Sequence, residues 1–302
     1  MAKATANTSA SRAATAALSG DLAGAADLID RGLRRAGPSS HGDAQLWECR
    51  GDVALFRGDL TAALAAYEAA RRLAQAEGDE AEVAVNLVSE ALTLHYRGDD
   101  AAAGERSRLA LAAALRSGNP SAMAMAHYAG GELRHETDPE AARRLLDRSL
   151  ELAEGVDARF VFGIAGLSAA TMNARTGSTA RALELYALLV DHWLRAGVWT
   201  QQWTTLRTLV ALLAEVGEAG TGATLLAAIE AATTAAPVYG ADARRLDEAT
   251  GHLRRVLGEA TFETERRRGA QLGDESAVAL AARTLRRMAA EAGTATTPVA
   301  TP

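Results

Sequence analysis

A short turn signal recurs along the chain at nearly constant intervals. It is a glycine, or once a threonine, and stands at Gly20, Gly58, Gly98, Thr137, Gly177 and Gly217. The intervals are 38, 40, 39, 40 and 40 residues. A fixed period of this size is typical of stacked structural repeats. This repeat constrains the fold more than any other feature of the sequence.

Each repeat has the same internal pattern. A helical run precedes the glycine, which can take the left-handed conformation that ends a helix. The next residue can cap the following helix, at Asp21, Asp59, Asp99, Asp138 and Ser178. A small residue comes five positions after the turn residue, at Ala25, Ala63, Ala103, Ala142, Ala182 and Gly222. Four positions later stand Ile29, Tyr67, Ser107, Leu146, Tyr186 and Leu226. The pattern predicts helical hairpins that bury their apolar faces only by stacking.

The composition favours helices throughout. Hydrophobic residues make up 48% of the 302 residues and are mostly Ala and Leu, while there are only 6 prolines. We predict an all-α fold, a right-handed superhelical solenoid of about six antiparallel helix pairs over residues 12–236. A C-terminal helical cap is expected over residues 237–292. Residues 1–11 and 293–302 are expected to be a disordered leader and tail.

The charge and the single cysteine limit the classes of partner. A formal net charge of −6 gives no global electrostatic support to nucleic-acid binding. Cys49 alone cannot form an internal disulfide, and a buried or half-buried inert thiol is favoured over the alternative of a sensor. The N-terminus lacks the apolar core of a secretory signal, and the longest uncharged apolar run, residues 160–174, is too short to span a bilayer. We therefore predict a cytoplasmic protein without a membrane span.

Signals of catalysis, cofactors and metals are weak. Lys3 is the only lysine, and the sequence patterns of phosphate-binding loops, dinucleotide sites and zinc hydrolases do not occur. We predict no enzymatic activity and no cofactor. His127 and His135 are eight residues apart without a nearby cysteine, so polar residues of a groove are favoured over the alternative of a metal site. For the tryptophans at 193, 199 and 203, packing between hairpins is favoured over stacking on a ligand.

The second repeat resembles a tetratricopeptide repeat. Trp47, Gly51, Ala63, Tyr67 and Ala70 stand where that family's pattern places them, and Gly130 fills the small position of a later first helix. The repeat departs from the pattern at Arg50 and Ala54, and its period is longer than is usual for the family.

The C-terminal part resembles a second group of proteins. Residues 225–281, with Leu257, Gly258, Glu259, Phe262 and Gly269, are similar to the ending of actinobacterial regulators that join an ATPase module to a helical-repeat region, such as LuxR-type and SARP-like activators. No nucleotide-binding module or helix-turn-helix occurs in this chain. The resemblance implies the sensor or regulatory region of such a regulator. A free-standing adaptor that joins protein partners is the alternative.

The tetratricopeptide resemblance also implies a binding surface. In that family the first helix of each pair lines a concave groove, and the matching positions are Asp52, Phe56, Val88, His95, Tyr96, His127, Arg134, His135, Thr171, Arg175 and Arg207. The set changes from acidic and aromatic to basic and His-rich along the chain. This gradient favours an acidic peptide or domain, or a small polar effector, as the ligand, and a generic polar groove is the alternative.

Overall fold

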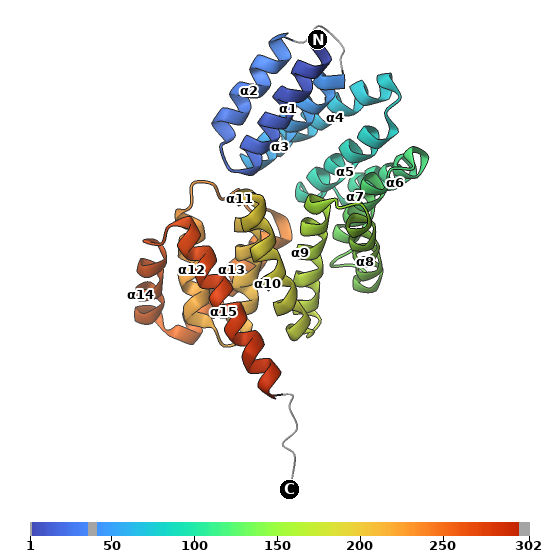
Figure 1. The fold of residues 1–302 in the computed structure, drawn as a ribbon. Helices are drawn as coiled ribbons and strands as arrows, with labels where there is room; N and C mark the ends of the chain where they lie inside the picture. Colours follow the sequence, from blue (N-terminus) through green and yellow to red (C-terminus); the bar gives the residue numbers. More distant parts are fainter. Residues whose placement is uncertain (1, 36–40, 296–302) are drawn as a thin grey trace. The chain divides into compact units, whose positions relative to one another are not determined.

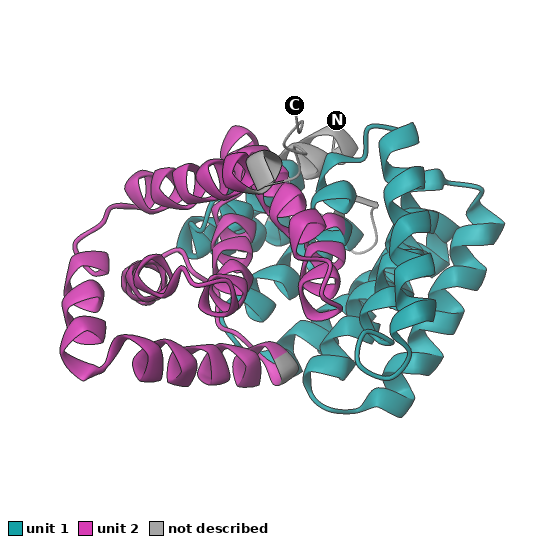
Figure 2. Cartoon of the chain, turned by 90° about the horizontal axis from the view of Figure 1, so that it is seen from below, with its two compact units in different colours: residues 1–165 teal, residues 166–302 magenta. Residues whose placement is uncertain are grey.

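The chain is all α-helical in the computed structural model, which describes residues 2–35 and 41–295 (Figure 1). Within this part of the chain there are fifteen helices, and most pack against their neighbours in sequence. The chain divides into two compact units, residues 1–165 and 166–302 (Figure 2). The predicted all-α class is confirmed, and the sequential packing is consistent with a helical repeat.

Unit 1 holds the first eight helices and the start of the ninth. They are α1 (Ala2–Leu18), α2 (Leu22–Arg35), α3 (His41–Phe56), α4 (Leu60–Glu77), α5 (Glu80–Tyr96), α6 (Asp100–Ser117), α7 (Pro120–Glu132), α8 (Pro139–Gly155) and α9 (Arg159–Arg175), which continues into unit 2. Unit 2 continues with α10 (Thr179–Ala196), α11 (Trp199–Glu215), α12 (Ala219–Ala231), α13 (Gly240–Leu257), α14 (Glu259–Gly269) and α15 (Asp274–Ala295).

Consecutive helices form packed pairs in both units. In unit 1, α1 packs with α2, α3 with α4, α5 with α6, and α7 with α8, and in unit 2 α11 packs with α12. Each turn predicted from the repeat lies between the two helices of such a pair or between α9 and α10. The handedness of a superhelix stays a prediction.

Left-handed glycines mark the repeated turns. The φ angles are +91° at Gly20, +88° at Gly58, +84° at Gly98, +81° at Gly177 and +87° at Gly217. A side chain with a Cβ is strained in this conformation, so the turn itself requires the glycine. The pair α7–α8 lacks it and uses a longer turn, in which the Thr137 N–H donates to the Arg134 carbonyl oxygen at 3.1 Å.

The predicted helix caps are confirmed at the aspartates. The side chains of Asp21, Asp59, Asp99 and Asp138 each accept from the backbone N–H three residues later, at 2.8, 2.9, 3.1 and 3.0 Å. The prediction for Ser178 is wrong, because its side chain makes no capping hydrogen bond at the start of α10.

The small and large positions of the repeat form the contact between paired helices. The predicted small alanines are all 0% exposed, and the residues four positions later are at most 7% exposed. Where the first helix offers a glycine, the backbones approach closely. A Cβ on Gly51 would lie 2.4 Å from Cε1 of Tyr67, and a Cβ on Gly131 would lie 2.8 Å from Cγ of Leu146. Gly131, rather than Gly130 as the sequence suggested, therefore occupies the small position of α7.

The first and last helices extend into the segments that were predicted to be a disordered leader and tail. α1 begins at Ala2 and crosses the predicted boundary at residue 11. Ala10 of α1 packs in a core cluster with Ile29, Leu46 and Val53. At the other end α15 reaches Ala295, and the remainder of the predicted tail lies outside the described residues.

Helices α13 to α15 occupy the segment predicted as a cap, where α14 packs on α12 and α15 on α10. Phe262 is 0% exposed, and the guanidinium carbons of Arg254 and Arg266 lie 4.9 and 5.8 Å from its ring centroid. Gly269 lies against the backbone of Thr224. The residues that carry the resemblance to regulator endings thus include packing residues of unit 2.

The tryptophans of unit 2 also serve packing. Trp193 and Trp203 are 1% and 0% exposed, and the Trp203 indole N–H donates to Oγ1 of Thr234 at 2.7 Å. This confirms the favoured packing interpretation for these two side chains.

We predict that Gly269→Ala lowers the stability of unit 2 by roughly 2 kcal/mol or more, since overpacked sites cost this much. The added Cβ would lie 2.0 Å from the Thr224 carbonyl oxygen, which belongs to rigid backbone. Gly220→Ala, in α12, is the matched control, because no atom lies within 4 Å of the added Cβ and alanine favours the helix. Urea unfolding followed by circular dichroism compares the two variants, and an equal effect of both would contradict the packing role of Gly269.

Candidate functional site

The residues predicted to line a groove belong to both units. Those from Asp52 to His135 lie in unit 1, and Thr171, Arg175 and Arg207 lie in unit 2. Their role in binding stays a prediction, and the surroundings of each residue are those of the unit to which it belongs.

Three of these residues lie inside the protein. Val88 is 0% exposed in a core cluster of unit 1, and His135 is 8% exposed. Arg207 is 9% exposed, and its guanidinium donates to the Ala236 carbonyl oxygen at 2.7 Å. Burial lowers the pKa of Arg207. Val88 and Arg207 differ from the surface position that we expected, because α5 and α11 are covered by neighbouring helices on more than one side.

The other predicted residues of unit 1 are partly or fully accessible. Phe56 and Tyr96 are half-buried, and Nδ1 of His95 lies 2.6 Å from Oδ1 of Asp100. His127 is half-buried, and its Nδ1 is buried without a hydrogen-bond partner. Arg134 is exposed, and it donates to the Gly130 carbonyl oxygen at 2.9 Å.

The remaining residues of unit 2 are less enclosed than Arg207. Thr171 donates to the Leu167 carbonyl oxygen at 3.0 Å and lies 3.4 Å from the Tyr186 hydroxyl, whereas Arg175 is exposed.

Asp52 belongs to a group of three half-buried carboxylates, Glu48, Asp52 and Glu82, which we call the acidic cluster. Gln45, Glu48 and Asp52 are three and four residues apart on α3 and therefore share one face of that helix. Glu82 reaches this face from α5. Its carboxyl group lies near enough to Glu48 for its charge to raise the pKa of that residue, and it accepts from Nε2 of Gln45 at 3.4 Å. The acidic cluster therefore joins two successive helix pairs.

Burial makes Glu48 and Asp52 costly to ionise. Burial, together with the charges of Glu82 and Asp52, raises the pKa of Glu48 well above its usual value. Burial raises the pKa of Asp52 to about 6, although the hydroxyl of Tyr67 donates to Oδ1 of Asp52 at 2.8 Å and acts in the opposite direction. Burial likewise raises the pKa of the Cys49 thiol, which is 6% exposed, as expected of an inert cysteine.

No cation of the described chain neutralises the acidic cluster. Arg50 pairs with Asp30 of α2, and Arg71 of α4 pairs with Glu90 at 2.6 Å. The polar partners of the acidic cluster are the amide of Gln45 and the hydroxyl of Tyr67. The cluster thus places carboxyl groups on a partly accessible face, and the described chain supplies no cation beside them.

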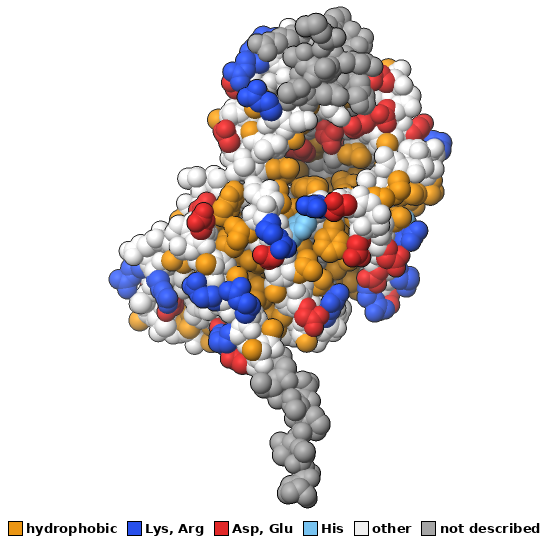
Figure 3. All heavy atoms as spheres, viewed as in Figure 1, with side chains coloured by type: hydrophobic (Ala, Val, Ile, Leu, Met, Phe, Trp, Pro, Cys, Tyr) orange, Lys and Arg blue, Asp and Glu red, His pale blue; other side chains and the backbone are white. Residues whose placement is uncertain are grey.

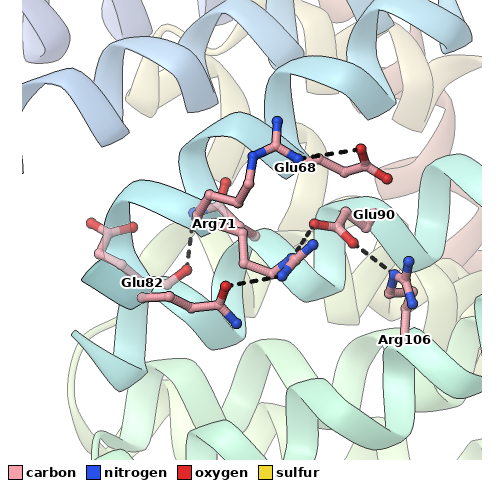
Figure 4. A network of polar contacts seen from close by, with 8 residues as sticks. Glu68, Arg71, Glu82, Glu90 and Arg106 are labelled. Carbon is pink, nitrogen blue, oxygen red and sulfur yellow. Dashed lines mark hydrogen bonds and ion pairs between the residues drawn. The ribbon is translucent and has the colours of Figure 1, made fainter. Parts of the chain in front are cut away.

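A second carboxylate of α5, Glu90, has a different environment (Figure 4). Its side chain is 0% exposed and accepts from Nε of Arg71 in α4 at 2.6 Å and from Nε of Arg106 in α6 at 2.7 Å. Arg71 also donates to Gln75 at 3.1 Å. Glu90 therefore ties three helices together, and its acceptors are used within the protein.

The surface view shows how charged side chains gather within each unit (Figure 3). Acidic side chains gather in the upper part of unit 1, and arginine side chains gather over α14 and α15 of unit 2. Among the arginines of these two helices, Arg266 of α14 pairs with Glu230 at 2.5 Å and Arg287 of α15 pairs with Glu218 at 2.5 Å. The acidic cluster has no such pairing.

Unit 2 also has a polar pocket of about 280 Å³. Its lining residues come from the start of α12, from α14 and from α15, and include Thr221, Thr224, Glu265, Arg268 and Leu280. Thr224 donates to Glu265 at 2.8 Å, and Arg268 lies 3.7 Å from the same carboxylate. Thr224, Glu265 and Arg268 of the pocket therefore interact with one another.

The described residues contain no group of three or more His, Cys, Asp or Glu side chains arranged to hold a metal ion. None of their helices combines the length and the apolar character that a bilayer span needs.

Comparison with known proteins yields no relative: no protein-family model and no curated protein sequence matches the chain. The tetratricopeptide and regulator likenesses therefore remain resemblances, and what the structure establishes is an all-helical protein of sequentially packed helices.

Glu90→Gln should lower the stability of unit 1 by roughly 3 kcal/mol, because two partly buried arginines would lose their shared counter-charge. The matched control is Glu105→Gln, whose carboxylate pairs with Arg108 at the surface with side-chain exposures of 50% and 66%. An exposed pair of this kind contributes little to stability, because solvent screens both charges. Urea unfolding measures both, and a loss at Glu90 no larger than at Glu105 would show that the buried network does not hold the helices together.

Asp52→Asn should stabilise the protein near neutral pH. Since the folded-state pKa of Asp52 is raised, the folded protein is disfavoured as the pH rises from the unfolded-state value toward about 6, and this cost persists above it. Asparagine keeps an acceptor for Tyr67 and removes the charge, so the gain should be on the order of 1 kcal/mol near pH 7.5 and should shrink toward pH 4.5. Urea midpoints of variant and parent at both pH values test this; a gain independent of pH would refute it.

Proposed function

We propose that this chain is a non-catalytic binding scaffold that holds a protein or peptide partner against the first helices of its helix pairs. The observation that carries the proposal is the acidic cluster, where α3 and α5 of successive pairs hold three carboxylates with no compensating cation from the described chain. Holding three carboxyl groups half-buried with no cation beside them costs stability, and a function in binding explains why such groups persist.

The packing of the helices supports the same proposal. The pair α3–α4 contacts the next pair through α4 and α5. Each added pair therefore contributes a buried contact between helices and a segment of outer surface. Arrays of this kind present long surfaces on rigid elements, which suits the recognition of a polypeptide.

The resemblances refine the proposal. By likeness to tetratricopeptide proteins the array is a right-handed superhelix, and by likeness to actinobacterial regulators the scaffold is the sensor or regulatory region of a transcription regulator with an ATPase module. The alternative is a free-standing adaptor that joins partners without such a module. The identity of the partner separates the two.

Site-specific crosslinking in the native cell tests the proposal. A photoreactive benzoylphenylalanine replaces Gln45, beside the acidic cluster, and in a control chain it replaces Glu105, whose side chain is 50% exposed on α6. We expect one dominant partner to be crosslinked from position 45 and much less of it from position 105, because binding uses the α3–α5 face.

Mass spectrometry of the crosslinked species then gives its sequence. A protein with an ATPase module supports the regulatory form of the proposal, and a partner without one supports the adaptor. Equal crosslinking from both positions, or none above background from position 45, would contradict a binding role for this face.

A further inference from the structure

We infer that Arg207 of unit 2 is the centre of a binding site for a carboxylate group, which an acidic side chain of a peptide or a small free acid can supply. The inference goes beyond the proposed function, because it concerns unit 2 and does not depend on the acidic cluster. It also assigns one residue and one chemical group to the earlier expectation of an acidic or small polar ligand.

The surroundings of Arg207 carry the first step. The residue is 9% exposed, and its guanidinium has one acceptor in the described chain, the Ala236 carbonyl oxygen at 2.7 Å. No carboxylate of the described residues lies within ion-pair distance of it. Burial lowers the pKa of Arg207, and the charge of nearby Asp242 acts in the opposite direction. The carboxylate of Asp242, however, is bonded to Arg245 at 2.5 Å.

Other partly enclosed arginines show what is missing at Arg207. Arg71 of unit 1 has a side chain that is 18% exposed and bonds Glu90 directly, and Arg245 of unit 2 is 22% exposed and bonds Asp242 directly. Arg207 is more enclosed than either, yet no carboxylate of the described chain contacts it. Arginine is rarely buried without a counter-charge, because the loss of hydration penalises the cation. The missing counter-charge points to an anion from outside the described chain.

The guanidinium remains open to such an anion. Nε and Nη1 of Arg207 have no acceptor in the described chain, and neither atom is sealed from solvent. Thr204 and Thr208 flank Arg207 on α11 and are half-buried. Their hydroxyls already donate to carbonyl oxygens of the same helix, to Thr200 at 2.9 Å and to Thr205 at 3.1 Å. Arg207 is therefore the charged donor that this face of α11 offers.

The charges favour a carboxylate over a phosphate. The N–H donors of guanidinium form a flat fork that matches the two oxygens of a carboxylate. One carboxylate also supplies the single counter-charge that Arg207 lacks. A phosphate ester carries about −1.5 to −2 charges near neutral pH, and the negative charge of Asp242 beside the site would repel the excess.

Fluorescence anisotropy with the full chain and a labelled, end-capped peptide of alternating glutamate and alanine tests the inference. Arg207→Gln is compared with Arg195→Gln, which removes the same charge from a side chain of α10 that is 72% exposed. We expect Arg207→Gln to bind the peptide about tenfold or more weakly than the parent, because the charge-assisted hydrogen bonds are lost. Arg195→Gln should bind within about twofold of the parent, since solvent screens its charge.

Unlabelled glutarate, which carries carboxylates without a peptide backbone, separates the two sources of the group. Displacement of the peptide by glutarate shows that a small free acid suffices, and binding of the peptide alone shows that a polypeptide must present the carboxylate. Both outcomes support the inference when Arg207→Gln weakens the binding and Arg195→Gln does not.

Four results would overturn the inference. They are equal losses in the two variants, equal binding of the matching glutamine and alanine peptide, binding of neither probe by the parent, and displacement of the peptide by inorganic phosphate at lower concentrations than by glutarate. None of these results bears on the crosslinking from position 45, so the proposed function is judged separately.

Urea unfolding of the free protein distinguishes binding from a purely structural role. If Arg207 only held the Ala236 carbonyl oxygen, Arg207→Gln would lower the urea midpoint and leave peptide binding unchanged, which would contradict the inference. We expect a midpoint no lower than that of the parent, because the variant removes an enclosed charge without a counter-charge.

Hydrogen exchange of the parent chain keeps the test decisive even if Arg207→Gln does not fold. The glutamate peptide should slow exchange in α11 and in the first turns of α13, which carry Arg207 and Asp242. Protection confined to other helices would refute the site.

Discussion

The close contact between paired helices is the constraint on which the rest of the structure depends. A small residue on one helix lets a large residue of its partner approach the backbone, as Gly51 does for Tyr67 and Gly131 for Leu146. Because one pair leaves apolar surface uncovered, the next pair must stack on it. The periodic glycine turns set where the pairs other than α7–α8 bend, and aspartate caps satisfy amides at the start of second helices such as α4 and α6.

The stacking packs α4 against both α3 and α5, and this junction contains two kinds of acidic group. Glu90 is wholly buried and shared by Arg71 and Arg106, so its charge is balanced within the protein. Glu48, Asp52 and Glu82 are half-buried and have no balancing cation in the described chain. Carboxylates close together in sequence thus have opposite roles, one in stability and the others in the binding we propose, and the difference follows from which helices surround them.

Individual residues show how much of the candidate site could be predicted from the sequence alone. Asp52 was identified through its place in the repeat, and the spacing of Gln45, Glu48 and Asp52 on one helix face was a usable signal for Glu48 as well. Glu82 could not be added in this way, because its contact with Glu48 joins residues of different helix pairs. Val88 and Arg207 were expected at a surface, but α5 and α11 are covered on several sides, which no single-helix pattern reveals.

The sequence by itself determined the all-helical class, the helix pairing and the positions of the repeated turns, because these depend on local interactions that recur with a fixed period. Tertiary structure alone decided that Gly131 rather than Gly130 receives the large residue of α8, that Gly269 must remain small against Thr224, and that the carboxylates of α3 meet Glu82. These outcomes depend on how helices rotate and approach when they pack. Where three helices meet, the burial and the charge of a side chain depend on how the helices are arranged, so no single segment of the sequence shows them.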